Sequence, residues 1–193
     1  MTRLLRHLVR DERGNHAVEF ILVLPAALLV MLGLGDLTYE AYLQSVLTGA
    51  VQKAARDGSI QGSNSATLDQ MVQNLVKQVA PKATFVSTRV NYDNYAAVAP
   101  EPFTDSNHNG VRDPHECFTD VNGNGVWDSN PGVNGQGGAS DVTVYKMTMT
   151  YNRLFPAWLV GWSSSETISA TTYLKNQPYA TQNVVNTSTP VCT

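Results

Sequence analysis

The chain has 193 residues, a mass of 21.0 kDa and a formal net charge of −3 at pH 7. This length fits one membrane segment and one modest domain, and the negative balance argues against a nucleic-acid-binding protein. Four of the 13 basic residues precede an apolar run, and 13 of the 16 acids follow it. Because basic residues stay cytoplasmic, we expect the N-terminus in the cytoplasm and the rest of the chain across the membrane.

The apolar run extends from Ala17 to Gly35, and Glu19 is its only charged residue. As a helix its 19 residues span about 28 Å, close to the thickness of the hydrocarbon core of a bilayer. A secretory signal peptide is the alternative, but the residues after Gly35 make a poor cleavage site and the amphipathic pattern continues through them. We predict that Pro25 kinks or loosens this helix.

The segment from Gly14 to Pro25, GNHAVEFILVLP, resembles the opening of TadE-like proteins, the minor pilins or pseudopilins of tight-adherence (Flp) pili. The glycine, the glutamate five residues later, Phe20 and the downstream proline match by position. Glycine followed by four residues and Glu-Phe also resembles the cleavage site of type IV prepilins. The resemblance implies that a prepilin peptidase cuts between Gly14 and Asn15, and that the mature helix is extracted into a filament or assembly complex.

A carboxylate inside an apolar helix is costly, so Glu19 is a candidate functional residue. Cleavage would create a new amine at Asn15, four residues away. An amine and a carboxylate offset each other's burial only when paired, so we expect the amine of a neighbouring subunit to neutralise Glu19, with Phe20 beside it in the subunit contact. The alternative is an acid near the start of the span that reaches the lipid headgroups.

Two amphipathic helices are predicted after the apolar run. Leu43, Val46, Leu47, Ala50, Val51 and Ala54 recur with helical spacing. A continuous helix from Ala17 to Asp57 would be membrane-embedded in its first half and would carry a globular head on its second. The alternative is a single-span anchor followed by a separate core helix. In the second helix, six residues form the predicted core face: Leu68, Met71, Val72, Leu75, Val76 and Val79.

Three strands are predicted in the head, at Phe85–Tyr92, Asp141–Tyr151 and Thr167–Leu174, from their alternation and β-branched residues. They suggest a small antiparallel sheet packed on both helices, so the predicted fold class is α+β. The segment from Leu154 to Trp162 is too short to span a membrane. It is interpreted as a cover over the sheet edge or as a hydrophobic loop that contacts a partner or lipid.

The cysteines Cys117 and Cys192 would lie in an oxidising compartment, which favours a disulfide over two unpaired thiols. Their spacing alone does not decide between these alternatives. The residues from 180 to 193 read as a polar tail that Cys192 would tie down.

An internal repeat with a period of 15 residues lies between the first two predicted strands, within residues 103–131. The segment FTDSNHNGVRD aligns with FTDVNGNGVWD. Numbered from the first aspartate, oxygen-bearing side chains occupy positions 1, 3, 5 and 9, glycine occupies position 6 and glutamate position 12, as in the calcium loop of an EF-hand. The predicted Ca²⁺ ligands of this first loop are Asp105, Asn107, Asn109, the Val111 carbonyl, Asp113 and Glu116.

The second loop departs from the pattern at position 12, which is Pro131. A second ion would need a carboxylate from Glu116 or Glu101, or water. Without long flanking helices the repeat resembles the calcium loops of dockerins and thrombospondin type 3 repeats, and the alternative is a solvated Asn/Gly-rich turn. We infer a stabilising ion rather than a switch. The predicted ligands of the second loop are Asp120, Asn122, Asn124, the Val126 carbonyl and Asp128.

No phosphate-binding loop, nucleophile elbow or catalytic carboxylate pair is recognisable, so we do not expect an enzyme. The expected organisation is a leader (1–14), a membrane helix half (15–35), an amphipathic helix half (36–58) and a periplasmic or extracellular head (59–193). The leading hypothesis is a bacterial inner-membrane minor pilin or pseudopilin. Its partners would be other pilin subunits, the pilus assembly platform, the prepilin peptidase and membrane lipid. Alternatives are a membrane-anchored calcium-binding adhesion domain and, with less support, a calcium-dependent hydrolase.

Overall fold

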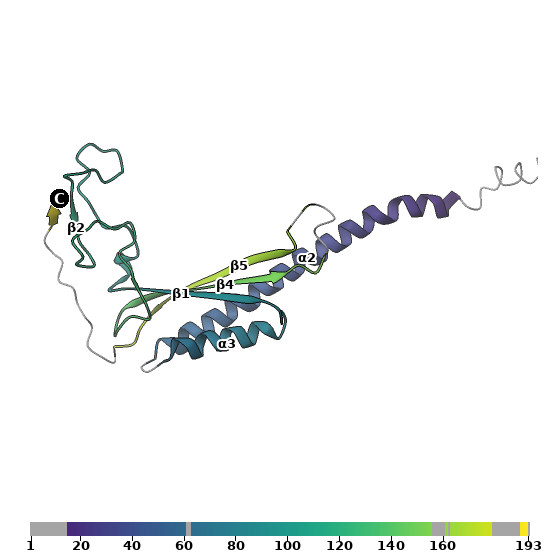
Figure 1. Cartoon of the computed structure of the whole chain (residues 1–193), viewed down its shortest axis with the longest axis horizontal. Helices are drawn as coiled ribbons and strands as arrows, with labels where there is room; N and C mark the ends of the chain where they lie inside the picture. The colour runs from purple at the N-terminus through teal and green to yellow at the C-terminus, as the bar shows by residue number, and fades with distance from the viewer. Residues whose placement is uncertain (1–14, 61–62, 156–160, 162, 179–189, 193) are drawn as a thin grey trace, which may run out of the picture. The chain divides into compact units, whose positions relative to one another are not determined.

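The computed structural model describes residues 15–60, 63–155, 161, 163–178 and 190–192 (Figure 1). These residues fall into two compact units, one within Met1–Tyr42 and Arg153–Ser164 and the other within Leu43–Asn152 and Ser165–Thr193. The elements in chain order are α2 (Asn15–Gly58), α3 (Ser65–Lys77), β1 (Thr84–Tyr92), η2 (Tyr95–Ala97), β2 (Cys117–Thr119), β3 (Val133–Asn134), β4 (Val142–Asn152), β5 (Ser165–Lys175) and β6 (Pro190–Cys192).

Helix α2 is 44 residues long and continues through Pro25 without interruption. Its apolar side chains before Gly35 are mostly exposed. From Leu43 onward the helix buries one face against the head, because apolar residues recur there at helical spacing. The buried residues of this face are Leu43, Leu47, Ala50, Val51, Ala54 and Ala55. The predicted continuous helix is confirmed.

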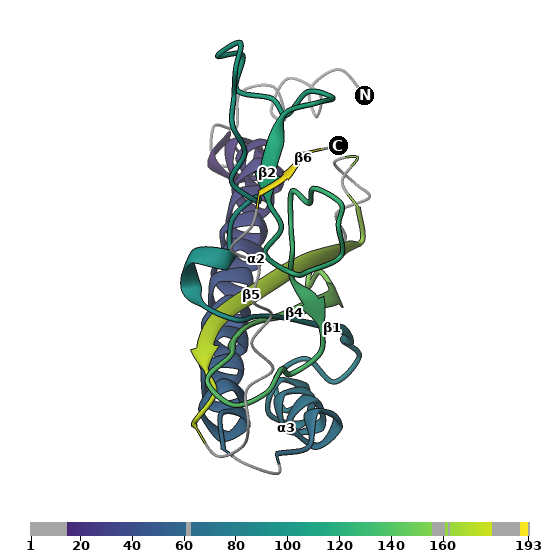
Figure 2. The ribbon, with the colours of Figure 1, turned by 90° about the vertical axis from the view of Figure 1, so that its left-hand side faces the viewer.

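Helix α3 begins at an asparagine cap. The Asn64 side chain accepts hydrogen bonds from the main-chain N–H groups of Ala66 at 2.9 Å and Thr67 at 3.4 Å, which satisfies donors that have no partner inside the helix. Of its predicted core face, Leu68, Val72 and Val76 are buried, and the other three residues are half-buried. In both views α3 lies beside the C-terminal half of α2 (Figure 1 and Figure 2).

The main sheet has the strand order β3-β1-β4-β5, and all its pairs are antiparallel. Strand β4 is central, and its register joins Thr84 to Thr150 on one side and Ser165 to Asn152 on the other. Alternate side chains of β4 are buried toward the helices, as the sequence pattern predicts. They are Tyr145, Met147, Met149 and Tyr151. The three predicted strands and the α+β class are confirmed.

In the unit within Met1–Tyr42 and Arg153–Ser164, a buried ion pair joins the segment after β4 to α2. Arg153 donates to the Asp36 carboxylate, and the main-chain N–H of Leu154 donates to the same carboxylate at 3.2 Å. Phe155 is buried, whereas the Leu154 side chain is exposed. Most of the predicted hydrophobic loop after Phe155 lies outside the described residues, so both interpretations of it stay predictions.

Candidate functional site

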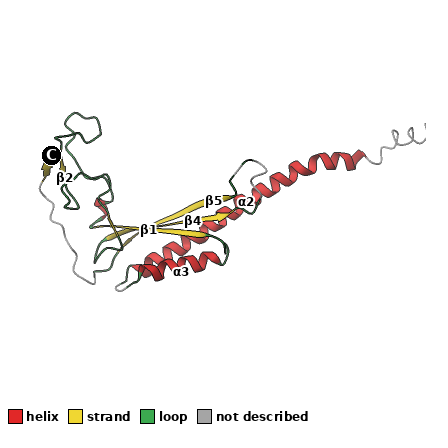
Figure 3. Cartoon of the chain, in the orientation of Figure 1, coloured by secondary structure: helices red, strands yellow, loops and turns green. Residues whose placement is uncertain are grey.

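Between β1 and β4 the chain is mostly loop, with only the short elements η2, β2 and β3 (Figure 3). This segment contains the 15-residue repeat. The repeat begins two residues before the aligned segments, because Glu101 occupies the place in the first copy that Glu116 occupies in the second. We call residues 101–115 repeat 1 and residues 116–130 repeat 2. Loop 1 is residues 105–116, and loop 2 is residues 120–131.

Loop 1 is wound around the side chains of its own polar residues. The Asp105 carboxylate accepts hydrogen bonds from the main-chain N–H groups of Asn109 at 3.2 Å and Gly110 at 2.8 Å. The amides of Asn107 and Asn109 donate to one oxygen of Asp113 at 2.7 and 2.8 Å. Gly110 has a φ of 76°, a conformation that glycine adopts without a side-chain clash.

Loop 2 repeats these contacts. The Asp120 carboxylate accepts from the N–H groups of Asn124 at 3.2 Å and Gly125 at 2.7 Å. The amides of Asn122 and Asn124 donate to one oxygen of Asp128 at 2.8 and 2.6 Å. Gly125 has a φ of 75°. The two sequences therefore fold into loops of the same design.

Each loop is closed by the glutamate of the other repeat. In loop 1, Glu116 accepts from the N–H groups of Ser106 at 2.8 Å and Asp113 at 3.0 Å. In loop 2, the same two positions donate to Glu101: Val121 at 2.7 Å and Asp128 at 2.9 Å. Glu101 thus replaces the carboxylate that Pro131 cannot supply. The sequence left the choice between Glu101 and Glu116 open, and extending the repeat alignment two residues upstream of Phe103 would have favoured Glu101.

The two repeats meet in an antiparallel bridge between Phe103 and Phe118. The N–H of Thr104 donates to the Cys117 carbonyl at 2.8 Å, and the N–H of Thr119 donates to the Pro102 carbonyl, also at 2.8 Å. In each bond the fourth residue of one repeat donates to the second residue of the other repeat. The hydrogen bonds between the two repeats are therefore related by an approximate two-fold symmetry.

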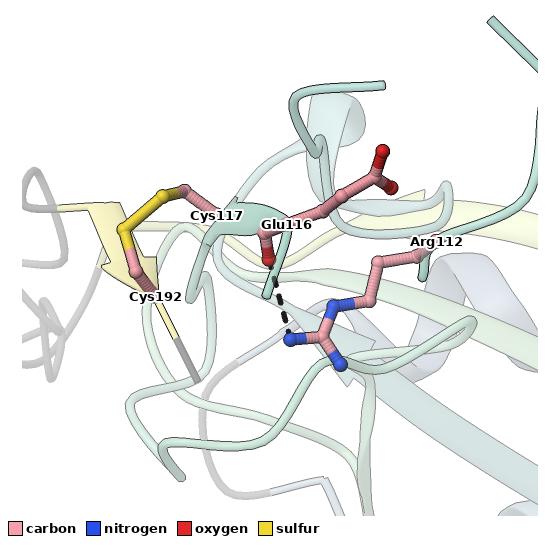
Figure 4. Close-up of a disulfide and its surroundings, with 4 residues drawn as sticks. All are labelled: Arg112, Glu116, Cys117 and Cys192. Atoms are coloured by element: carbon pink, nitrogen blue, oxygen red, sulfur yellow. Dashed lines mark hydrogen bonds between the residues drawn. A yellow bond between two sulfur atoms is a disulfide. The ribbon is translucent and has the colours of Figure 1, made fainter. Parts of the chain in front are cut away.

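The side chain at position 8 of each loop also reaches the repeat that closes it. Trp127 donates to the main-chain oxygen of Glu101 at 2.8 Å and packs edge-on against the Phe103 ring. Arg112 donates to the main-chain oxygen of Glu116 at 3.3 Å (Figure 4). Its guanidinium also lies over the Phe118 ring. An indole and a guanidinium, although chemically different, fill equivalent places.

A disulfide fixes the end of the chain to repeat 2. Cys117 and Cys192 are bonded across the small sheet formed by β2 and β6, which pairs the two cysteines directly (Figure 4). Since Cys117 follows Glu116, the covalent bond lies next to the residue that closes loop 1. Of the predicted tail, only residues 190–192 are described.

The predicted ligands of each loop are of the type that calcium prefers, because all their polar side chains carry oxygen. Among the described residues, no three His, Cys, Asp or Glu side chains form a group that could hold a metal ion by themselves. An ion would therefore depend on asparagine and main-chain oxygens as well. The residues Glu101, Glu116 and Asp120 are only 1%, 6% and 6% exposed.

These three buried carboxylates receive hydrogen bonds from neutral main-chain groups and form no ion pair with any described residue. Burying a carboxylate without an opposite charge is unfavourable, and proteins offset the cost with a paired cation or a metal ion. A divalent cation bound here would therefore neutralise negative charge that no described side chain neutralises. Calcium ligation by the named residues stays a prediction.

The second candidate region is the start of α2. Gly14 lies outside the described residues, so the structure does not test the predicted cleavage. Asn15 is the first residue of α2, and both Glu19 and Phe20 are exposed. In the described part of the chain, α2 is the one helix long and apolar enough to cross a membrane, and its most apolar part is not buried within the fold.

Residues 14–56 match the family model described as TadE-like protein. The match covers the sequence motif at Gly14, the apolar run and most of the buried face of α2. It does not reach the sheet or the repeats. No curated protein and no solved structure is similar enough to this chain to count as a match. The match and the apolar helix together fit a membrane-anchored protein.

Proposed function

We propose that this chain is a minor pilin or pseudopilin that takes part in assembling a tight-adherence pilus or secretion apparatus. The match over residues 14–56 supports this most strongly, because one segment contains the processing motif, the apolar span and the amphipathic helix. In this proposal the protein lies in a bacterial inner membrane with its head in the periplasm. It associates there with other pilin subunits and the assembly platform, and it enters a surface pilus from the membrane. Its role is structural rather than enzymatic.

The proposed maturation is a cut between Gly14 and Asn15, after which the new amine of one subunit pairs with Glu19 of a neighbour. A carboxylate inside an apolar span is costly to bury, and a positively charged amine of a neighbouring subunit would offset that cost within the assembly. Phe20 would lie in the same subunit contact. The peptidase is therefore an obligatory partner, and lipid surrounds the first half of α2 before extraction.

The test is to determine the N-terminus of the protein isolated from membranes, with and without the prepilin peptidase. We expect protein that begins at Asn15 only when the peptidase is present. Gly14→Val should keep the leader, whereas the control Gly33→Ala, with open space around its Cβ, should still be cut. Protein that keeps Met1 in its working form would instead favour a membrane-anchored binding domain.

We further propose that Ca²⁺ stabilises the head through loop 1 and loop 2. The repeated oxygen ligands and the buried, unpaired carboxylates support this. Extracellular calcium is typically near millimolar, which fills sites of modest affinity. The melting temperature of the full chain in detergent should rise with calcium and fall with chelator. Asp105→Asn should reduce that rise, and Asp57→Asn, which alters a half-exposed acid of α2 outside the loops, should not. An unchanged melting temperature in the unaltered protein would exclude the stabilising ion.

A further inference from the structure

We propose that the two loops bind calcium as one cooperative unit, because each is closed by the glutamate of the other repeat. This inference rests on the calcium binding proposed above. It adds the number of ions, the coupling between them and the role of Glu101, which the loop 2 pattern itself lacks.

The first step is the exchange of carboxylates. Glu116 closes loop 1 but belongs to repeat 2, and it lies four residues before Asp120, the first ligand of loop 2. Glu101 closes loop 2 but lies four residues before Asp105, the first ligand of loop 1. An ion that holds either glutamate therefore also fixes the chain that enters the other loop.

The second step is the main chain that connects them. The residues between each glutamate and the following aspartate form the Phe103–Phe118 bridge, with its two hydrogen bonds of 2.8 Å. If loop 1 loosens and releases Glu116, this bridge loses one of its two strands. Loop 2 then loses the fixed position of Asp120, and the symmetric argument starts from Glu101.

The third step concerns charge. Glu101 and Glu116 are almost fully buried and have no ion-pair partner among the described residues. The first ion to bind orders the Phe103–Phe118 bridge that both loops share. The second ion then loses less conformational entropy on binding, so its affinity is higher, which is positive coupling. Coupling between two sites on one protein typically changes affinity by about 5- to 150-fold.

The experiment titrates calcium into the full chain in detergent micelles. Calorimetry gives the number of ions bound, and the amide resonances of Gly110 and Gly125 in glycine-labelled protein report on each loop separately. The unaltered protein should bind two ions, with both resonances moving together. Glu101→Gln should abolish binding in loop 2 and weaken loop 1 at least about fivefold. Glu116→Gln should give the mirror result.

Two further variants separate coupling from damage to the fold. Asp128→Asn removes a loop 2 ligand but leaves both glutamates, and it too should weaken loop 1 at least about fivefold. Asp57→Asn, outside the repeats, should leave both loops unchanged. Circular dichroism checks that each variant keeps its helices and sheet.

The outcomes distinguish the two proposals. If neither glycine resonance responds to 10-fold more calcium than is found outside cells, about 10 mM, the calcium role itself is wrong. If two ions bind but loop 1 keeps its affinity in both Glu101→Gln and Asp128→Asn, calcium binding stands and the coupling is overturned. Binding of a single ion also overturns the coupling.

Discussion

Arg89 of β1 donates two hydrogen bonds to the carboxylate of Asp69 in α3, from Nη2 to Oδ1 at 2.6 Å and from Nη1 to Oδ2 at 3.0 Å. The same carboxylate accepts the hydroxyl groups of Ser87 at 2.6 Å and Tyr145 at 2.7 Å. The Arg89 guanidinium also lies 4.0 Å from the centre of the Tyr145 ring. Three polar side chains from β1 and β4 thus meet on Asp69 of α3, which fixes this helix on the sheet that carries the repeats.

Replacing Asp69 with alanine should lower the free energy of unfolding of the head by about 3 kcal/mol, because it leaves a mostly buried guanidinium without its carboxylate. The side chains of Arg89 and Asp69 are 9% and 17% exposed. Urea unfolding followed by circular dichroism measures the change. The control is Asp57→Ala, whose ion pair with Lys53 is about half exposed and should contribute less than about 0.5 kcal/mol. Equal losses in both variants would contradict the special role of Asp69.

The same carboxylate should make stability depend on acid. Burial alone would raise the pKa of Asp69, but the hydrogen bonds from Arg89, Ser87 and Tyr145 outweigh it and hold the pKa below its ordinary value. A lowered pKa means that the stabilisation is complete above about pH 4, the unfolded value, and is lost as the pH falls through the folded value. Urea unfolding of the unaltered protein and of Asp69→Asn should therefore differ most above pH 4 and converge in stronger acid. A constant difference would argue against this origin.

Gly110→Ala should destabilise the head by about 1 kcal/mol or more, although nothing lies within 4 Å of the added Cβ. The reason is its φ of 76°, which alanine adopts only with strain. Gly49 offers a matched control, since it also has open space around its Cβ but lies inside α2. Gly49→Ala should stabilise the protein by about 0.5–1 kcal/mol. Opposite signs in thermal unfolding would support the backbone argument, and a loss in both would contradict it.

Removing the disulfide should loosen the repeats before the main sheet. For a separation of 75 residues, the loop-entropy estimate gives a loss of about 4.5 kcal/mol for the pair Cys117→Ala and Cys192→Ala. The three residues of β6 pair only with β2 among the described strands, so limited proteolysis should cut the C-terminal segment first. A reducing agent should reproduce the effect in the unaltered protein and add nothing in the double variant. A reductant effect that persists in the double variant would show another cause.

Local patterns were sufficient for the larger elements. The apolar run and the helical spacing after Leu43 predicted α2, and the alternation around Tyr145 predicted β4, because side-chain period and secondary structure are directly linked. The elements missed were η2, β2, β3 and β6, each of two or three residues. Elements this short have no side-chain period to read, and the three strands among them also depend on pairing with distant segments.

The candidate site divides in the same way. The sequence by itself determined two loops of equal design, since the position of each aspartate, asparagine and glycine within a loop is a local property. It also determined the oxygen-rich chemistry and the motif at Gly14. The sequence also assigned Glu116 to loop 1, as position 12 of the pattern. The choice between Glu101, Glu116 and water for loop 2 was decided only by the tertiary structure, because Glu101 and the loop 2 residue Val121 are 20 positions apart and meet through the bridge between repeats. The pairing of Asp36 with Arg153, 117 residues along the chain, has the same physical reason: no sequence period connects groups that only the folded chain brings together.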